Sequence, residues 1–411
     1  MTSSRRFFLT AAAALAVGLA SGQAAAQKKY GPGANDKSIK IGNTNPYSGP
    51  ASAYGTIGKA IGAYFAMVNE KGGVNGRKVE WISLDDGYSP PKAKEQVRKL
   101  VESEEVLALF QTLGTPTNSA IHEYMNEAKV PMLFVATGAT KWGDPKNYPW
   151  TMGWQPTYQT FGKIAAKYIL DNHPNGKIGI LYQNDDYGKD YLTGLQMGLG
   201  DKYKKMVIAE QTYEVTDPTV DSQIVNLKAA GADIFYDITT PKFAAQAIKK
   251  AHEIGWKPVH ILNDVSASIG SVFKPAGIEA SQGIVSAGYL MDPTDPEWQK
   301  TPEYAEWSAW MDKYLPQGDK ATTFNVYGYV VAQAMEQVFK QCGDDLTREN
   351  VMKQAASLKN FHAKMLLPGV NANTSATDFY PLEQMQMVRV KGESLERFGP
   401  IYSADGMTKT N

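Results

Sequence analysis

Short apolar runs alternate along the first part of the chain with segments whose apolar residues recur at helical spacing. The pattern predicts strands at 39–44, 78–84, 106–111 and 132–136, with helices near 57–71, 90–103 and 117–128. Buried strands separated by helices are typical of a parallel sheet with crossover connections. This part of the chain is therefore predicted to form an α/β lobe.

The same alternation resumes after the Pro- and Trp-rich stretch PKNYPWTMGWQPTY. Here the pattern predicts strands at 177–183, 206–212, 233–238 and 259–262, with helices between them. Beyond Gly283 it becomes mostly helical, with helices near 301–314, 322–341 and 347–358 and a closing strand at 384–390. The sequence thus predicts a second α/β lobe of similar size.

Composition agrees with a two-domain globular protein. A chain of 411 residues, of which 43% are hydrophobic and 20% charged, can bury large cores. Lys plus Arg and Asp plus Glu both number 42, so no basic field is present to attract nucleic acid. The single cysteine, Cys342, has no Cys or His partner at ligand spacing and is expected to be a buried apolar residue on a helix.

Residues 1–26 have the features of an export signal. Arg5 and Arg6 precede an apolar run that ends in small residues, and cleavage is expected after Ala26. The arginine pair suits a twin-arginine signal, although general secretion uses similar starts. No cysteine follows the cleavage site to carry a lipid anchor, and no later apolar run approaches the ~20 residues that span a membrane. We expect a soluble periplasmic protein.

The motifs that carry catalysis are missing from the sequence. It has no Gly-rich dinucleotide fingerprint, no P-loop and no nucleophile elbow. His122-Glu123 and His252-Glu253 each begin a zinc-protease motif, but neither is followed by the second histidine. The protein is therefore expected to be no enzyme and to need no cofactor or metal. An exported α/β enzyme remains the weaker alternative.

Three stretches carry a resemblance to a known family. In order, they are IKIGNTNPYSGPASAYG, GGVNGRKVEWISLDDGYSPPKA and YQNDDYGKDY. They resemble the branched-chain amino-acid binding-protein family, periplasmic receptors that serve ABC importers. The resemblance implies a type I periplasmic binding fold, with two doubly wound α/β lobes joined by three hinge crossings. The crossings are expected near 152–156, 287–291 and 368–372, so that lobe 1 comprises 37–154 plus 288–369 and lobe 2 comprises 155–287 plus 370–404.

Two loops are expected to hold a ligand carboxylate. In LGTPTNSAI, Thr115 suits a helix N-cap and Pro116 the first helical position, so the amides from Thr117 onward should be free to bind an anion. A hydroxyl of Thr115 or Thr117 would add a donor. The loop VATGATKWG follows the next strand, and such neighbouring βα loops form the ligand crevice of an open sheet. By resemblance, the carboxylate ligands are Gly114, Thr117, Gly138 and Thr140.

The remaining candidate ligand-binding residues concern the other end of the ligand. Tyr54 and Tyr187 match positions of aromatic walls in the resembled family. Amino-acid-binding members receive the ammonium group on two acids; here one position is Gln155 and the other is near Asp264. Two further candidates are Thr240 and Trp154. Trp154 crowds the first crossing together with Trp150 and Tyr158, and these rings would suit either an apolar ligand tail or packing at the hinge.

We therefore expect a monomer that closes on a small ligand and delivers it to an ABC-transporter permease. The sequence favours an apolar or branched-chain amino acid and an aromatic carboxylate equally as ligands, and it favours short amides less. Gln155 and the clustered aromatic residues favour a carboxylate without an amine. A ligand-sensing receptor shares the fold but would require a following membrane span, and none is read before Asn411.

Overall fold

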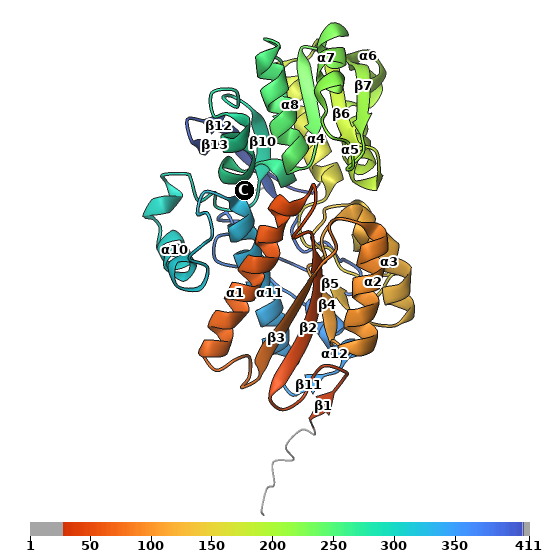
Figure 1. The fold of residues 1–411 in the computed structure, drawn as a ribbon, viewed down its shortest axis with the longest axis vertical. Helices are drawn as coiled ribbons and strands as arrows, with labels where there is room; N and C mark the ends of the chain where they lie inside the picture. Colours follow the sequence, from red (N-terminus) through yellow and green to blue (C-terminus); the bar gives the residue numbers. More distant parts are fainter. Residues whose placement is uncertain (1–27, 405, 407–411) are drawn as a thin grey trace, which may run out of the picture.

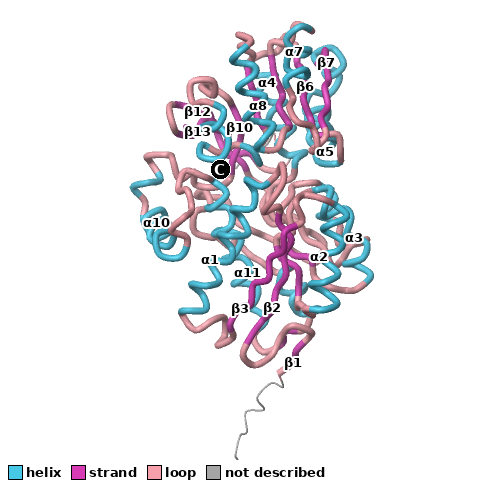
Figure 2. The backbone as a smooth tube through the Cα atoms, in the orientation of Figure 1, coloured by secondary structure: helices cyan, strands magenta, loops and turns pink. Residues whose placement is uncertain are grey.

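The computed structural model describes residues 28–404 and 406. The export signal expected at 1–26 lies outside these residues. The described chain forms two lobes stacked along the long axis of the molecule (Figure 1). In each lobe, helices flank the strands on both sides (Figure 2). The type I periplasmic binding fold expected from the resemblance is confirmed.

The first lobe is built around a parallel four-stranded sheet in the order β3-β2-β4-β5. Its strands are β2 (Ser38–Asn45), β3 (Lys78–Asp85), β4 (Ala108–Phe110) and β5 (Met132–Leu133). Its helices are α1 (Gly55–Glu70), α2 (Pro90–Arg98), α3 (Thr115–Glu127), α10 (Pro302–Tyr314), α11 (Thr323–Cys342) and α12 (Arg348–Ala355). Helices α1 and α11 cover one face, and α2 and α3 cover the other (Figure 1). Strands β1 (Lys29–Tyr30) and β11 (Asp345–Leu346) pair at the far end.

The second lobe contains a seven-stranded sheet in the order β13-β12-β10-β9-β8-β6-β7. Its strands are β6 (Ile178–Gln183), β7 (Val207–Tyr213), β8 (Ile234–Ile238), β9 (Val259–Leu262), β10 (Val285–Gly288), β12 (Met385–Lys391) and β13 (Ser394–Tyr402). The first five are parallel, and β12 runs antiparallel to both of its neighbours. The helices are α4 (Tyr158–Asn172), α5 (Asp186–Leu199), α6 (Tyr203–Met206), α7 (Asp221–Ala229), α8 (Pro241–Glu253) and α9 (Lys274–Ala276).

Several elements differ from the sequence prediction. Strands β4 and β5 stop earlier than expected because Gln111 and Phe134 adopt left-handed backbone conformations, with φ of 58° and 52°, which interrupt a strand. Strand β10, of sequence VSAG, lies where the pattern had become mostly helical, since a four-residue strand shows little periodicity. Strand β13 was also missed; it contains Gly399, a residue depleted in strands.

The chain passes between the lobes three times. The first passage lies between Thr151, bridged to the first-lobe strand β5, and the start of α4. The second follows β10, where Leu290 bridges to Leu366. The third falls later than the expected 368–372, because residues 370–381 still pack on the first lobe: Ala372 bridges to Phe361, and the Thr374 amide donates to the Leu358 carbonyl.

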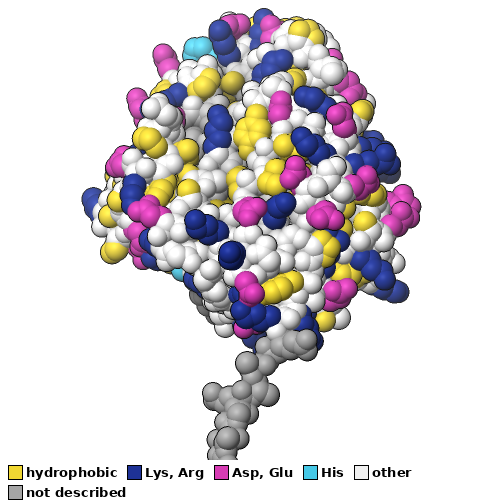
Figure 3. Space-filling view, turned by 60° about the horizontal axis from the view of Figure 1, so that its bottom comes forward, with side chains coloured by type: hydrophobic (Ala, Val, Ile, Leu, Met, Phe, Trp, Pro, Cys, Tyr) yellow, Lys and Arg dark blue, Asp and Glu magenta, His cyan; other side chains and the backbone are white. Residues whose placement is uncertain are grey.

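Charge and burial of the described residues agree with the composition. Lys and Arg side chains are interspersed with Asp and Glu on the face drawn in Figure 3. Cys342 is buried at the end of α11, and burial raises the pKa of its thiol to about 12. None of the helices in the described chain is long and apolar enough to cross a membrane.

Candidate functional site: a cavity between the lobes

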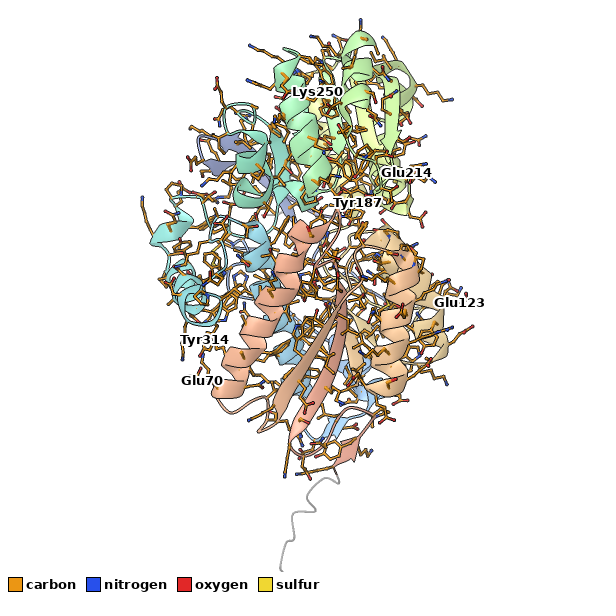
Figure 4. All side chains as sticks on the ribbon, viewed as in Figure 1. Glu70, Glu123, Tyr187, Glu214, Lys250 and Tyr314 are labelled. Atoms are coloured by element: carbon orange, nitrogen blue, oxygen red, sulfur yellow. The ribbon has the colours of Figure 1, made fainter. Side chains whose placement is uncertain are left out.

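A cavity of about 100 Å³ lies between the two lobes. The first lobe contributes Tyr54, Tyr88, Gly114, Thr115, Phe324 and Tyr327 to its wall, and the second contributes Tyr158, Tyr187, Thr240 and Asp264. Figure 4 shows Tyr187 at the junction of the lobes. Because a single water molecule needs only ~10–15 Å³ of such space, the cavity has room for a small organic ligand.

The N-terminus of α3 forms one end of the polar wall. The N-cap is Gly114, with φ of 100°, and not Thr115 as expected; Thr115 and Pro116 occupy the first helical turn. Glycine suits this position because it adopts a positive φ without strain. A Cβ at residue 114 would also lie 2.5 Å from the Tyr88 ring. The Thr115 hydroxyl is 2.6 Å from the Thr137 hydroxyl. The N-terminal end of α3, where the helix dipole is positive, therefore lies at the cavity wall.

Three residues expected to bind the carboxylate do not line the cavity. The Thr117 hydroxyl turns back to donate to the carbonyls of Leu113 and Gly114. Gly138 lies beneath the Tyr158 ring. Thr140 sits at the rim outside the cavity, where its amide and hydroxyl donate to Asp190 at 2.8 and 2.9 Å.

Tyr158 occupies the space above the second βα loop. Its amide donates to the Gly138 carbonyl at 2.8 Å, and a Cβ on Gly138 would come within 2.7 Å of the Tyr158 ring. The ring stacks on Tyr191 at 4.2 Å and meets Tyr187 edge-on at 5.3 Å. Burial raises the pKa of Tyr158, so the hydroxyl remains protonated. The absence of a side chain at residue 138 thus allows an aromatic ring to form part of the wall.

The two expected aromatic walls both reach the cavity. Tyr54 is buried, and its hydroxyl donates across the junction to the Val265 carbonyl at 3.2 Å. Tyr187 is 2% exposed, and its hydroxyl has no hydrogen-bond partner among the described residues. Trp154 does not line the cavity; it is fully buried and packs edge-on against Phe134 at 5.2 Å. Its role is packing at the first crossing.

Gln155 and Thr240 line the cavity but are already engaged by tyrosines. The Gln155 Oε1 atom accepts a hydrogen bond from Tyr327 at 3.1 Å. The Thr240 amide, at the N-cap of α8, donates to the Tyr213 hydroxyl at 3.0 Å. Both residues therefore orient aromatic neighbours while facing the ligand space.

Asp264 lies where the ammonium-binding acid was expected, after β9. Tyr191 donates to its Oδ1 atom at 2.5 Å. Removal from water raises the pKa of Asp264 to about 7, because burial disfavours the charged form. Of the described residues that line the cavity, none is Lys, Arg or His. A positively charged group of a ligand would compensate this carboxylate.

The sequence analysis missed several residues of the wall. They are Tyr88, Tyr289, Asp292, Phe324 and Tyr327. Tyr289 lies within the expected second crossing and Asp292 directly follows it, and these positions were the available signal. Tyr88 comes from another loop, and Phe324 and Tyr327 come from the first turns of α11, where apolar periodicity cannot distinguish a cavity wall from a core.

The rim of the cavity is held by contacts between the lobes. Besides the pair formed by Thr140 and Asp190, the Lys141 ammonium lies 2.8 Å from the Asp186 carboxylate. The Tyr380 hydroxyl donates to the Thr140 carbonyl at 2.7 Å and supports the same loop. These contacts belong to a closed arrangement of the lobes. Within the described chain, no group of three or more His, Cys, Asp or Glu side chains is placed to hold a metal ion.

Two lobes that enclose a cavity at their junction are typical of bilobed solute-binding proteins. The chain belongs to the periplasmic binding protein family, whose model matches residues 38–394. The resemblance to the branched-chain amino-acid binding proteins is confirmed.

Among the relatives of this chain is Leu/Ile/Val-binding protein homolog 7 of Brucella suis. It is 26% identical over 314 residues, which are 73% of this chain and 77% of the relative. Two solved structures share the fold. A fatty acid ABC transporter substrate-binding protein from Thermomonospora curvata has a TM-score of 0.79 and 22% identity, covering 93% of this chain and 97% of its own. A branched-chain amino acid ABC transporter structure from Thermus thermophilus with bound valine has a TM-score of 0.80 and 15% identity, covering 90% and 97%.

Proposed function

We propose that the protein is the exported solute-binding component of an ABC importer. In this proposal a small ligand with a carboxylate group enters between the open lobes, and the lobes close around it. The closed, monomeric form then delivers the ligand to a membrane permease. The observation that carries the proposal is a cavity whose wall is supplied by both lobes, since only such a cavity couples binding to closure.

The end of the cavity at α3 suits a carboxylate. Gly114 and Thr115 bring the amide end of a 13-residue helix to the wall. Such an end binds an anion without a lysine or arginine. The two structural neighbours named above are described as proteins for a fatty acid and for valine, and both of these ligands carry a carboxylate.

Closure would follow from the ligand's contacts with both lobes. The first lobe would bind the carboxylate, and Tyr187 and Asp264 would contact the rest of the ligand from the second lobe. A ligand shifts the equilibrium between open and closed forms only by its differential affinity for them. Tyr54, which already donates to Val265 across the junction, would seal the cavity behind the ligand.

A thermal-shift screen of the mature protein, from Gln27, against amino acids and aliphatic and aromatic acids tests this function. A ligand at 100 times its dissociation constant adds about 2.7 kcal/mol to the free energy of unfolding. Each acid that binds should be compared with its carboxamide, which is similar in shape but uncharged. Small-angle scattering should show compaction with the acid. If no small molecule in the screen binds, or if saturating ligand leaves the dimensions unchanged, the proposal is wrong.

A further inference from the structure

The cavity contains a second carboxyl group that the carboxylate-binding function does not use. Asp264 and Asp292 are the acidic residues among the described cavity-lining residues, and they are not accompanied by Lys, Arg or His. A ligand that brought only a carboxylate would add a third acidic group to this closed space. Buried charges in proteins are paired or compensated, so the wall favours a ligand with positive charge.

Asp292 is held in a defined orientation with one oxygen uncompensated. Its Oδ1 atom accepts hydrogen bonds from the amide of Thr294, at 2.8 Å, and from the Thr294 hydroxyl. The Oδ2 atom has no partner within hydrogen-bond distance among the described residues. The hydroxyl of Thr323 lies nearby, but it donates to the Ala267 carbonyl at 3.3 Å. The residue is only 6% exposed.

The basic residue that pairs with the neighbouring Asp295 does not pair with Asp292. Arg397 lies 3.4 Å from Asp295 and 2.5 Å from Glu297, and it stacks over the Trp298 ring at 4.0 Å. Its guanidinium is thereby committed to the two neighbouring acids. Burial raises the pKa of Asp292 to about 6, which is the response of a carboxyl group that lacks a cation.

Asp292 lies away from the carboxylate end of the cavity. Asp292 contacts Thr294 and lies near Thr323 at the start of α11. The N-terminus of α3 lies instead against Tyr88 and Thr137, so the two sites share none of these neighbours. The rest of the cavity wall is mostly apolar and aromatic, with Tyr289, Leu290, Phe324 and Leu395 among its residues. An elongated ligand with an apolar middle fits this distribution, and aromatic rings also attract cations.

We propose that the ligand carries an ammonium group at the end remote from its carboxylate, and that Asp292 receives this group. The inference rests on the proposed function and names the class of ligand: an amine-bearing carboxylic acid with an apolar chain. Asp264 would receive a second ammonium group when the ligand is an α-amino acid. A basic amino acid would then engage all three polar positions.

Four ligands with the same six-carbon chain separate these contributions. Hexanoate has the carboxylate alone, 6-aminohexanoate adds the remote ammonium, norleucine adds the α-ammonium, and lysine has both. Calorimetry with the mature protein should show that 6-aminohexanoate binds at least about tenfold more tightly than hexanoate, the change expected for a gain of 1.4 kcal/mol. The same preference should hold for lysine over norleucine.

Asp292→Asn should remove both preferences. The asparagine carbonyl can still accept the hydrogen bonds of Thr294, and unchanged hexanoate affinity would show that the cavity remains intact. Asp264→Asn should instead remove the preference for norleucine over hexanoate. The matched control is Asp295→Asn, a buried acid of the same turn outside the cavity wall, which should leave all four affinities as they are.

The inference is overturned if hexanoate binds as tightly as 6-aminohexanoate, or if Asp292→Asn leaves the preference unchanged. It is also overturned if none of the four binds while another acid from the thermal-shift screen does, because the carboxylate-binding function would then hold without selection of an amine. Failure of every acid in the screen would refute the proposed function itself.

Discussion

Replacing Asp264 by asparagine should weaken the pH dependence of the equilibrium between the closed and open forms of the unliganded protein. Asp264 is enclosed by tyrosines in the closed arrangement, and Tyr191 is its hydrogen-bond donor. Opening the lobes would admit water to the cavity and stabilise the ionised carboxylate. The closed form therefore binds the proton more tightly than the open form.

The magnitude follows from the pKa in the closed arrangement. The pKa of Asp264 rises from the ordinary 3.8 to about 7, and each pKa unit corresponds to 1.36 kcal/mol. Ionisation thus disfavours the closed form by at most about 4 kcal/mol. Below pH 4 the group is protonated in both forms and imposes no cost. The cost grows as the pH rises from about 4 and is complete above pH 7.

Small-angle scattering of the unliganded mature protein at pH 5 and pH 8 measures this effect. The wild type should expand at pH 8, and Asp264→Asn should expand less. A suitable control is Asp171→Asn, which removes an exposed carboxylate paired with Lys167 on α4 and should respond like the wild type. Equal expansion of Asp264→Asn and wild type would show that the burial of this carboxylate does not govern opening.

Three further substitutions address the junction and the wall. Thr140→Val removes a hydroxyl that donates to Asp190. It should weaken the binding of every ligand by a similar factor, since a hydrogen bond to a charged group contributes about 1.5–3 kcal/mol. If calorimetry shows a loss of affinity for one ligand alone, Thr140 contacts that ligand directly. Gly138→Ala should lower the free energy of unfolding by about 1–3 kcal/mol through overpacking against Tyr158, and an unchanged denaturation midpoint would contradict the packing argument. Lys141→Met should change affinity less than about fivefold, because exposed ion pairs contribute up to about 1 kcal/mol; a larger change would mean that this pair dominates closure.

Most strands and helices were readable from the sequence because the apolar period differs between them, whereas β10 and β13 were not. The repeated βα alternation predicted two lobes, and the Thr-Pro pair predicted the start of α3 with an error of one residue in the cap. The position after β9 likewise identified Asp264. These features depend on local backbone preferences and on residues that are close in the chain.

The direction of individual loop side chains was decided by tertiary structure. Thr117 and Thr140 have the chemistry of carboxylate ligands, yet the first bonds to its own loop and the second to Asp190 on the other lobe. The left-handed backbone at Phe134 ends a strand early and redirects the chain that follows.

The content of the cavity was also a tertiary outcome. Tyr158 lies above Gly138 because the loop after β5 of the first lobe meets α4, the first helix of the second lobe. Asp292 lines the same cavity from a position more than 130 residues further along the chain. Apolar periodicity reports only that a residue is buried. Whether it faces a core or a ligand depends on how two separately folded lobes approach each other, and that contact is not encoded at any single position of the sequence.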